Sequence, residues 1–147
     1  MTGEHIMDKK INHLQMIQGV ISRIASNSFA LKGWAVTLVA GIFALASKDA
    51  DKMYFLVTYI PVVVFWGLDA YYLQQERLYR ALYDKVRTLS EDEIDFSMDT
   101  SPAEFHSEKT TYRNCLTSKT VLWFYFPLAL ITAGIIILTH HPRYFRI

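Results

Sequence analysis

The stretch FALKGWAVTLVAGIFALASKDADKMYFLVTYIPVVVFWGLDAYY, Phe29–Tyr72, decides the fold. It contains two apolar blocks, and only the short charged segment SKDADK separates them. Lys32 lies among apolar residues near its start, and Asp69 lies among aromatic residues near its end. Continuous apolar blocks, unlike apolar residues at period 2 or 3.6, are typical of membrane-spanning segments. The stretch therefore predicts a membrane hairpin in which each charge marks a boundary of the apolar layer.

The whole chain has 147 residues, which is enough for one domain, and 52% of them are hydrophobic. The charges are segregated, because residues 121–139 contain none while residues 74–120 hold most of them. The net charge of +1 gives no sign of a basic nucleic-acid footprint. Cys115 is the lone cysteine, so an intramolecular disulfide is excluded.

We predict an all-α integral membrane protein that forms a single membrane domain with three transmembrane helices. The first span covers residues 28–47, the second covers 53–73 and the third covers 121–139. Each has close to the ~20 residues that cross a hydrocarbon core of ~30 Å. Pro61 lies centrally in the second span and predicts a kink there. Lys32 lies one turn inside the first span, where its stem can reach the headgroups.

The distribution of lysine and arginine predicts the orientation. Four lie before or within the start of the first span, two in the hairpin turn, seven in the long loop and two in the tail of residues 140–147. Short cytosolic loops carry the excess of positive charge. The pattern therefore places the N-terminus and the long loop in the cytosol, and the C-terminus on the periplasmic side.

The polar parts of the chain are also predicted to be helical. Residues 5–27 form an amphipathic helix, and the second span continues as a cytosolic helix to about residue 89. We expect the apolar stripes of these two helices to pack on each other; the members of the stripes are Ile17, Ile21, Ile24, Leu78, Leu82 and Val86. The alternative is that both helices lie flat on the lipid surface. The small polar residues 25–28 either cap a new helix or allow a bend in a continuous one.

Residues 90–120 form an acidic cytosolic module in which we expect short helices joined by turns. Ser90 with Glu93, and Ser101 with Glu104, have the spacing of capping boxes. Pro102 would then take the first helical position of the second of these helices.

No motif for catalysis or for cofactor binding is recognisable, so we expect no catalytic residues, no cofactor and no enzymatic activity. His140 and His141 could hold a metal, but adjacent residues on a helix point apart, and a tail at the outer interface is the simpler interpretation. The acidic residues between Glu91 and Asp99 lack the spacing of a calcium loop. The expected partners are membrane lipid and further copies of the chain.

Three residues in the spans are candidates for a functional role. Lys32 and Asp69 are predicted to lie at similar depth on antiparallel helices and to form an interfacial charge pair, with an ion path through Asp69 as the alternative. Gly41 lies in a part of the first span that is rich in small residues, which favours close helix packing.

Two segments resemble a known family. ASNSFALKGWAVTLVAGIFALA, residues 25–46, and FWGLDAYYLQQERLYRALYDKVR, residues 65–87, resemble the RipA-type octameric proteins of the bacterial inner membrane. The resemblance implies a homo-oligomer, an octamer, in the inner membrane of a bacterium, with a link to stress or host adaptation. It carries no catalytic residues.

The sequence thus favours a non-enzymatic, oligomeric membrane protein that acts as a scaffold or as a gated pore. The alternative is a membrane effector of a phage-defence or stress pathway, which perturbs the membrane when its cytosolic part senses a signal. A transporter is disfavoured because three spans contain no inverted repeat.

Overall fold

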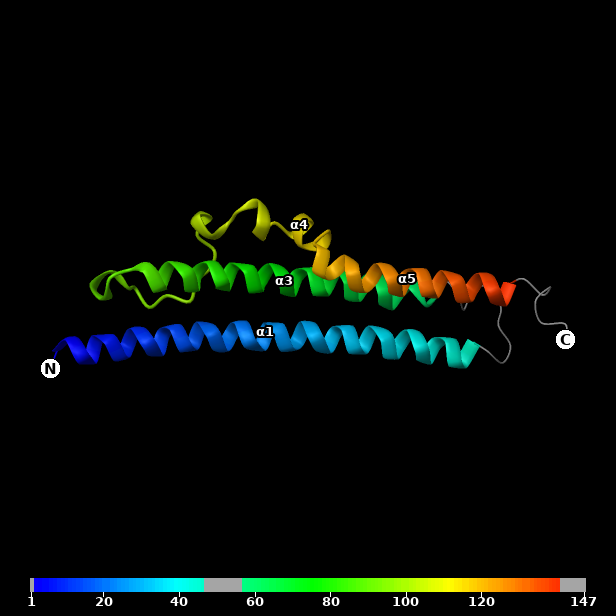
Figure 1. Ribbon diagram of the computed structural model, residues 1–147, viewed down its shortest axis with the longest axis horizontal. Coiled ribbons are helices and arrows are strands. Elements are labelled where there is room, and N and C mark those ends of the chain that lie inside the picture. The colour runs from blue at the N-terminus through cyan, green and yellow to red at the C-terminus, as the bar shows by residue number, and fades with distance from the viewer. Residues whose placement is uncertain (1, 47–56, 141–147) are drawn as a thin grey trace. The chain divides into compact units, whose positions relative to one another are not determined.

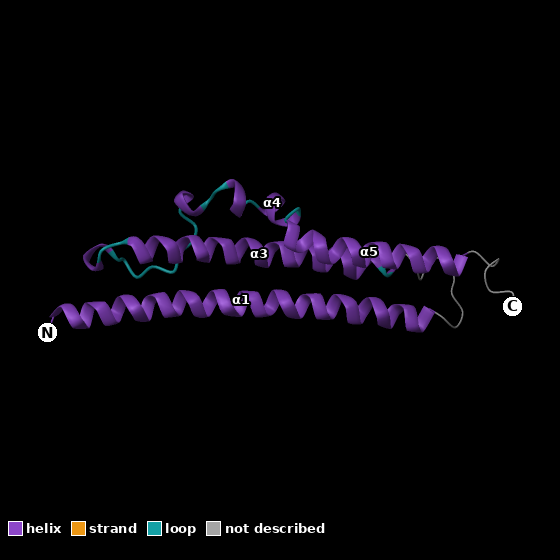
Figure 2. Cartoon of the chain, viewed as in Figure 1, coloured by secondary structure: helices purple, strands orange, loops and turns teal. Residues whose placement is uncertain are grey.

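The structure is a computed structural model that describes residues 2–46 and 57–140 of the chain. These residues are all-α, as predicted, with four α-helices and three short 3₁₀ helices (Figures 1 and 2). The elements are α1 (Thr2–Ala46), α3 (Tyr59–Thr88), η1 (Glu91–Glu93), η2 (Ala103–Phe105), η3 (Glu108–Thr110), α4 (Tyr112–Leu116) and α5 (Lys119–His140). The hairpin turn and the C-terminal tail lie outside the described residues.

The first predicted amphipathic helix and the first predicted span are one helix. α1 runs without a break through residues 25–28, so the small polar residues there do not cap a second helix. Alanine, serine and asparagine are weaker breakers than proline, and they keep the backbone hydrogen bonds of a continuous helix.

The helix is interrupted just before Pro61: residue 57 is helical, Thr58 is a turn, and α3 begins at Tyr59, so Pro61 lies in the first turn of α3. The first N–H groups of a helix have no intrahelical partner, so a proline there costs no hydrogen bond. α3 ends at Thr88, one residue before the predicted end. Residues 52–56, the earlier part of the predicted helix, lie outside the described residues, so the kink stays a prediction.

The chain divides into two compact units. Unit 1 comprises residues 1–28 and 71–115, and unit 2 comprises residues 29–70 and 116–147. α1 and α3 each contribute one part to unit 1 and the other part to unit 2. The polar and the apolar segments of the sequence are thereby sorted into different units.

The core of unit 1 forms where α1 meets the C-terminal part of α3. Five of the six residues of the predicted stripes are buried there in one cluster with two residues of the acidic module; the members are Ile17, Ile21, Leu78, Leu82, Val86, Ile94 and Phe105. Ile24, the sixth stripe residue, is half-buried. The stripe on α1 thus contacts the stripe on α3 within this unit, as helix–helix packing requires.

Two polar residues, Lys10 on α1 and Gln74 on α3, lie where the spacing of the stripes would place an apolar residue, and their side chains bind backbone carbonyl groups of unit 1. The ammonium group of Lys10 donates to the carbonyl oxygens of Leu89 at 2.7 Å and of Arg87 at 3.4 Å, which stabilises the C-terminal end of α3. The amide of Gln74 donates to the carbonyl oxygen of Thr110 at 2.9 Å. Their positions in the apolar pattern are explained by these contacts.

The acidic module consists of short helices and turns, as predicted. Ser90 and Glu93 form the expected capping box at η1. The second expected capping box is wrong: Pro102, not Ser101, precedes η2, and the backbone N–H of Ser101 donates to a carboxylate oxygen of Asp99 at 2.8 Å. The short turn at Asp99 therefore competes with the cap for Ser101.

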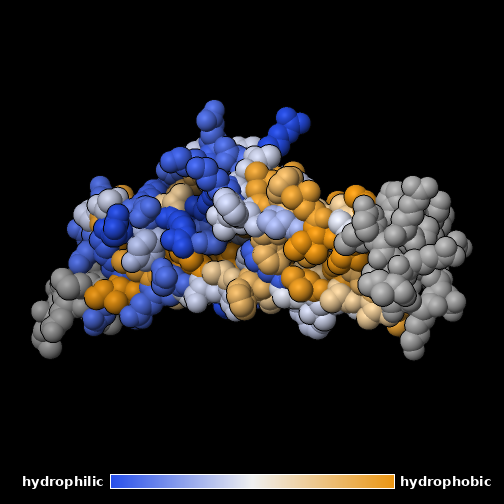
Figure 3. Space-filling view, turned by 45° about the vertical axis from the view of Figure 1, so that its right-hand side comes forward, coloured by the Kyte–Doolittle hydropathy of each residue, from blue (hydrophilic) through white to orange (hydrophobic). Residues whose placement is uncertain are grey.

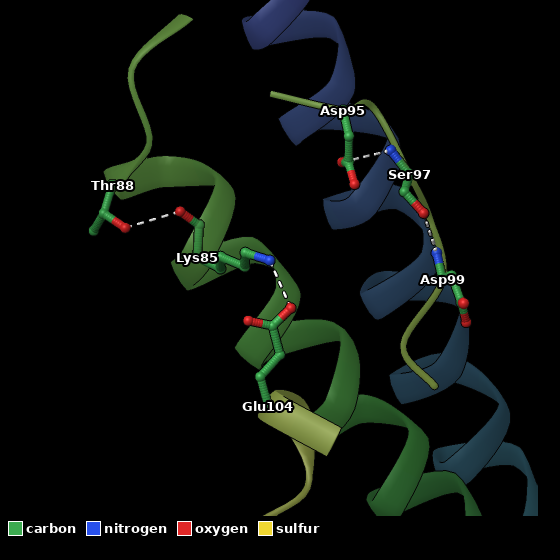
Figure 4. Close-up of polar contacts among 6 residues, drawn as sticks. All are labelled: Lys85, Thr88, Asp95, Ser97, Asp99 and Glu104. Atoms are coloured by element: carbon green, nitrogen blue, oxygen red, sulfur yellow. Dashed lines mark hydrogen bonds and ion pairs between the residues drawn. The ribbon is translucent and has the colours of Figure 1, made fainter. Parts of the chain in front are cut away.

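An ion pair and several side chain–backbone hydrogen bonds order this module (Figure 4). Lys85 on α3 forms an ion pair with Glu104 at 2.6 Å, and its ammonium group lies 5.4 Å from the ring centre of Phe105. The segment after η1 is held by successive side chain–backbone bonds, from the Ser97 N–H to Asp95 and from the Asp99 N–H to the Ser97 hydroxyl. Each bond spans two residues, so the segment is ordered without forming a helix.

Candidate functional site: a buried ion pair in an apolar bundle

Unit 2 contains a charge pair inside an apolar helix bundle. The ammonium nitrogen of Lys32, on α1, lies 2.6 Å from carboxylate Oδ2 of Asp69, on α3. The structure therefore brings together the two residues that the sequence paired. The side chain of Asp69 is 1% exposed and that of Lys32 is 21% exposed, so the carboxylate lies deeper than the ammonium group.

The third helix of the bundle, α5, completes the surroundings of the pair. The ring centre of Phe124 lies 5.9 Å from the ammonium nitrogen of Lys32, within the range of a cation–π contact. The neighbouring Tyr125 is 1% exposed and lies within electrostatic range of Asp69. Three helices thus converge on one charged centre.

Aromatic and hydroxyl side chains connect the helices around this centre. The indole N–H of Trp66 donates to the carbonyl oxygen of Leu116 at 2.9 Å, and the hydroxyl of Tyr59 donates to that of Ala129 at 3.5 Å. In an apolar environment such bonds align helices, because an unsatisfied polar group there is costly. Trp66 and Tyr125 are not predicted from the sequence, since an aromatic residue in an apolar block gives no pattern that separates a buried polar contact from an interfacial one.

Small residues allow the close approach of the helices near the pair. Ala35, three residues after Lys32 on α1, and Ala70, directly after Asp69 on α3, are both fully buried. Short side chains at these positions let the lysine stem cross to the neighbouring helix while the backbones stay close.

Chemically, the pair neutralises two charges inside an apolar medium. Burial of either charge alone is strongly unfavourable, and attraction at 2.6 Å offsets much of that cost. A carboxylate at this depth is also a candidate acceptor for a proton or a cation, as ionisable residues in apolar spans commonly are.

The remaining candidates from the sequence do not join this centre. Gly41 is exposed, and a Cβ atom built on it meets no atom of the described residues within 4 Å, so it makes no close helix contact within the chain. The side chains of His140 and His141 are not described. Among the residues that the structure describes, no group of three or more His, Cys, Asp or Glu side chains is arranged to hold a metal ion.

Cys115 is a structural residue of unit 1. Its side chain is fully buried, and the Arg77 guanidinium donates to its sulfur at 3.5 Å. Burial raises the pKa of the thiol above its usual value, although the positive charge of Arg77 acts in the opposite direction. A thiol with a raised pKa is a poor nucleophile, which disfavours a reactive role.

Comparison of this chain with models of protein families, with curated proteins and with solved structures finds no match. The resemblance to the RipA-type proteins therefore stays a hypothesis.

Two helices of the structure are long and apolar enough to cross a membrane. They are residues Asp8–Leu45 of α1 and residues Lys119–Ile137 of α5. The second predicted span, residues 53–73, is not among them; its first part lies outside the described residues, and its described part contains Asp69.

Proposed function

We propose that the chain is a self-associating integral membrane protein with three spans, and that it acts as a scaffold or gated pore rather than as an enzyme. In this proposal unit 2 lies in the inner membrane of a bacterium, while unit 1 lies in the cytosol. The assembly is a homo-oligomer, for which the resemblance suggests an octamer.

The observation that carries the proposal is the inverted polarity of unit 2. Two of its charged residues, Lys32 and Asp69, form an ion pair inside the bundle, whereas large apolar side chains are exposed on its surface. The exposed apolar residues of unit 2 include Phe29, Trp34, Val36, Leu38, Leu45, Ile60, Val63, Val64, Leu68, Trp123, Phe126, Leu130, Ile131 and Ile137. In the space-filling view the atoms over α5 are mostly hydrophobic, and those over α4 and the acidic module are mostly hydrophilic (Figure 3). A hydrophobic surface such as that over α5 is stable in lipid or against other apolar helices.

The low burial of the two apolar helices agrees with this proposal. A core helix of a soluble protein has the same length and composition, but it is mostly buried. Here only 11% of the most apolar window of α1 and 17% of that of α5 is buried. The exposed remainder supports contact with lipid and with further copies of the chain.

Topology reporters test the membrane placement. A reporter that is active only in the cytosol should work when it is fused after Val86, and it should fail when it is fused after Ile147. A matched periplasmic reporter should give the opposite pattern. Activity of the cytosolic reporter at both positions, or the reverse pattern, contradicts the three-span arrangement.

Self-association and pore activity need separate measurements. Static light scattering in detergent should give a particle of several chains with one defined stoichiometry, and a single chain per particle contradicts self-association. Ion flux through liposomes that contain the assembled protein then decides between a pore, which releases a trapped ion, and a scaffold, which does not.

A further inference from the structure

Unit 1 contains a hollow that has no part in the proposed membrane role. It lies between α1 and the segment that follows η1, and its volume is about 440 Å³. The described residues that line it are Lys9, Asn12, His13, Met16 and Phe96. Sites for small molecules commonly have volumes of about 300–1,000 Å³. The hollow is therefore large enough for a small organic molecule.

His13 provides a buried polar atom in the wall of the hollow. Its side chain is 4% exposed, and within the described parts of the chain its Nε2 atom makes no hydrogen bond. The ring instead packs edge-on against Phe96, with a distance of 5.6 Å between ring centres. Buried polar atoms in proteins almost always have a hydrogen-bond partner. The Nε2 atom has almost no accessible surface, so a ligand in the hollow would satisfy it after a small movement of a neighbouring side chain.

Phe96, which packs against His13 in the wall of the hollow, has an unusual backbone conformation. Its φ angle of 54° lies in the left-handed region, which bulky residues rarely adopt. The bonds from the N–H of Ser97 to Asp95 and from the N–H of Asp99 to Ser97 fix the chain around it (Figure 4). Such conformations are concentrated at binding sites, where the rest of the structure maintains them. The aromatic wall is therefore preformed.

The chemistry of the lining residues defines the class of ligand. Lys9, Asn12, His13 and Met16 follow the three- and four-residue spacing of one helix face. The lysine ammonium group and the asparagine amide donate hydrogen bonds, and an imidazole N–H can do so beside them. Met16 is 61% exposed and Phe96 is 43% exposed, so both offer apolar surface to a bound molecule. Among the described residues that line the hollow there is no carboxylate.

We propose that this hollow binds a small organic anion. Lys9 and His13 hold its anionic oxygen atoms, while Met16 and Phe96 cover its apolar part. The proposal goes beyond the proposed membrane function and does not depend on it, because all five residues belong to unit 1.

Benzoate is a suitable probe, since it joins a carboxylate to an apolar ring. The full chain is labelled with methyl-¹³C methionine, purified in detergent and titrated with sodium benzoate at constant ionic strength. The chain has five methionines, and a Met16→Leu variant assigns the signal of the one that lines the hollow. We expect a saturable shift of the Met16 methyl signal. The signal of Met98, which packs against the core of the same unit, should stay in place.

Matched variants test which side chains bind the probe. Lys9 is exposed, so Lys9→Gln should fold normally and raise the dissociation constant of benzoate about 3- to 10-fold. Lys109→Gln removes the same charge elsewhere on unit 1 and should change nothing, because Lys109 does not line the hollow. His13→Gln should weaken binding by a similar factor; if that variant does not fold, Lys9→Gln decides.

Three outcomes overturn the proposal. One is the absence of a saturable Met16 shift, and another is an unchanged dissociation constant in Lys9→Gln. The third is equal binding of benzyl alcohol, which lacks the charge, or of inorganic phosphate, which lacks the apolar part. Weaker binding of both these probes than of benzoate supports the proposed class of ligand.

Discussion

Replacement of the two charged residues of unit 2, singly and together, tests the central feature of the molecule. Coulomb's law gives an attraction of about 6 kcal/mol for charges 2.6 Å apart at an effective dielectric constant of ~20. Desolvation of the two groups offsets a large part of this attraction. The free energy of unfolding of variants that lack one partner is therefore a better measure of the pair's net contribution than the Coulomb attraction alone.

The two single variants should differ in stability because the two groups differ in burial. Lys32→Ala leaves the carboxylate of Asp69, which is 1% exposed, without its cation, and breaking a buried pair in this way costs about 3–5 kcal/mol. Asp69→Ala leaves the lysine, which is 21% exposed and has a flexible stem that can reach polar surroundings. We expect a loss of about 1–3 kcal/mol for that variant.

The double variant removes both charges and leaves neither of them buried. Its loss should be smaller than the sum of the two single losses by about 1–3 kcal/mol. The assay is reversible unfolding in mixed detergent micelles, followed by tryptophan fluorescence, because Trp34, Trp66 and Trp123 all lie in unit 2. Lys119→Ala, at an exposed position of α5, serves as the control and should stay within about 0.5 kcal/mol of the wild type.

Two results would refute this reasoning. Additive single losses, within about 0.5 kcal/mol, mean that Lys32 and Asp69 do not interact in the folded protein. A larger loss for Asp69→Ala than for Lys32→Ala means that the carboxylate is not the more deeply buried partner.

Three further predictions concern unit 1 and self-association. Leu82→Ala should lower the free energy of unfolding by about 2–5 kcal/mol, measured by circular dichroism, because Leu82 is 3% exposed in the core; a loss below 1 kcal/mol contradicts this packing. Hydrogen bonds from Ser90, the side-chain bond more than the backbone bond, hold the pKa of Glu93 below its usual value of 4.5. They therefore stabilise the folded state above pH 4.5, and this stabilisation disappears as the pH falls through the lowered pKa. Ser90→Ala should move the carboxyl titration of Glu93, followed by NMR, up towards 4.5, and an unchanged titration contradicts the cap. Gly41→Leu should reduce or change the size of the assembled particle on a calibrated column, and an unchanged size places Gly41 against lipid.

The helical class and the pairing of the stripes are accessible from the sequence because both follow from the spacing of apolar residues. The apolar stripe of α1 contains Ile17 and Ile21, and that of α3 contains Leu82. Each stripe has the spacing of one helix face, and the structure buries these residues in one cluster. The pairing of Lys32 with Asp69 follows from counting residues outward from the hairpin turn at 1.5 Å per residue. These features depend on local periodicity and chain length alone.

Other features depend on contacts between segments that no local pattern encodes. Pro61 has the same sequence context in the middle of a helix as in its first turn, and the position of the helix start decides between the two. The interruption of a stripe by Lys10 is explained only when the end of α3 lies within its reach. The hollow beside His13 requires the backbone of Phe96 in a conformation that its side chain does not favour.

The distribution of charge connects these observations to the membrane proposal. Unit 1 follows the arrangement of a soluble protein, with an aliphatic core and exposed ion pairs such as that of Arg80 with Glu76, which contribute little stability. Unit 2 has the opposite arrangement, because its ion pair is inside and its large apolar side chains are outside. In water the second arrangement exposes apolar surface at about 25 cal/mol for each Å² and also requires the desolvation of a charged pair. In lipid the exposure of apolar surface has no such cost. The buried ion pair then favours association of the helices, because no water competes for either charge.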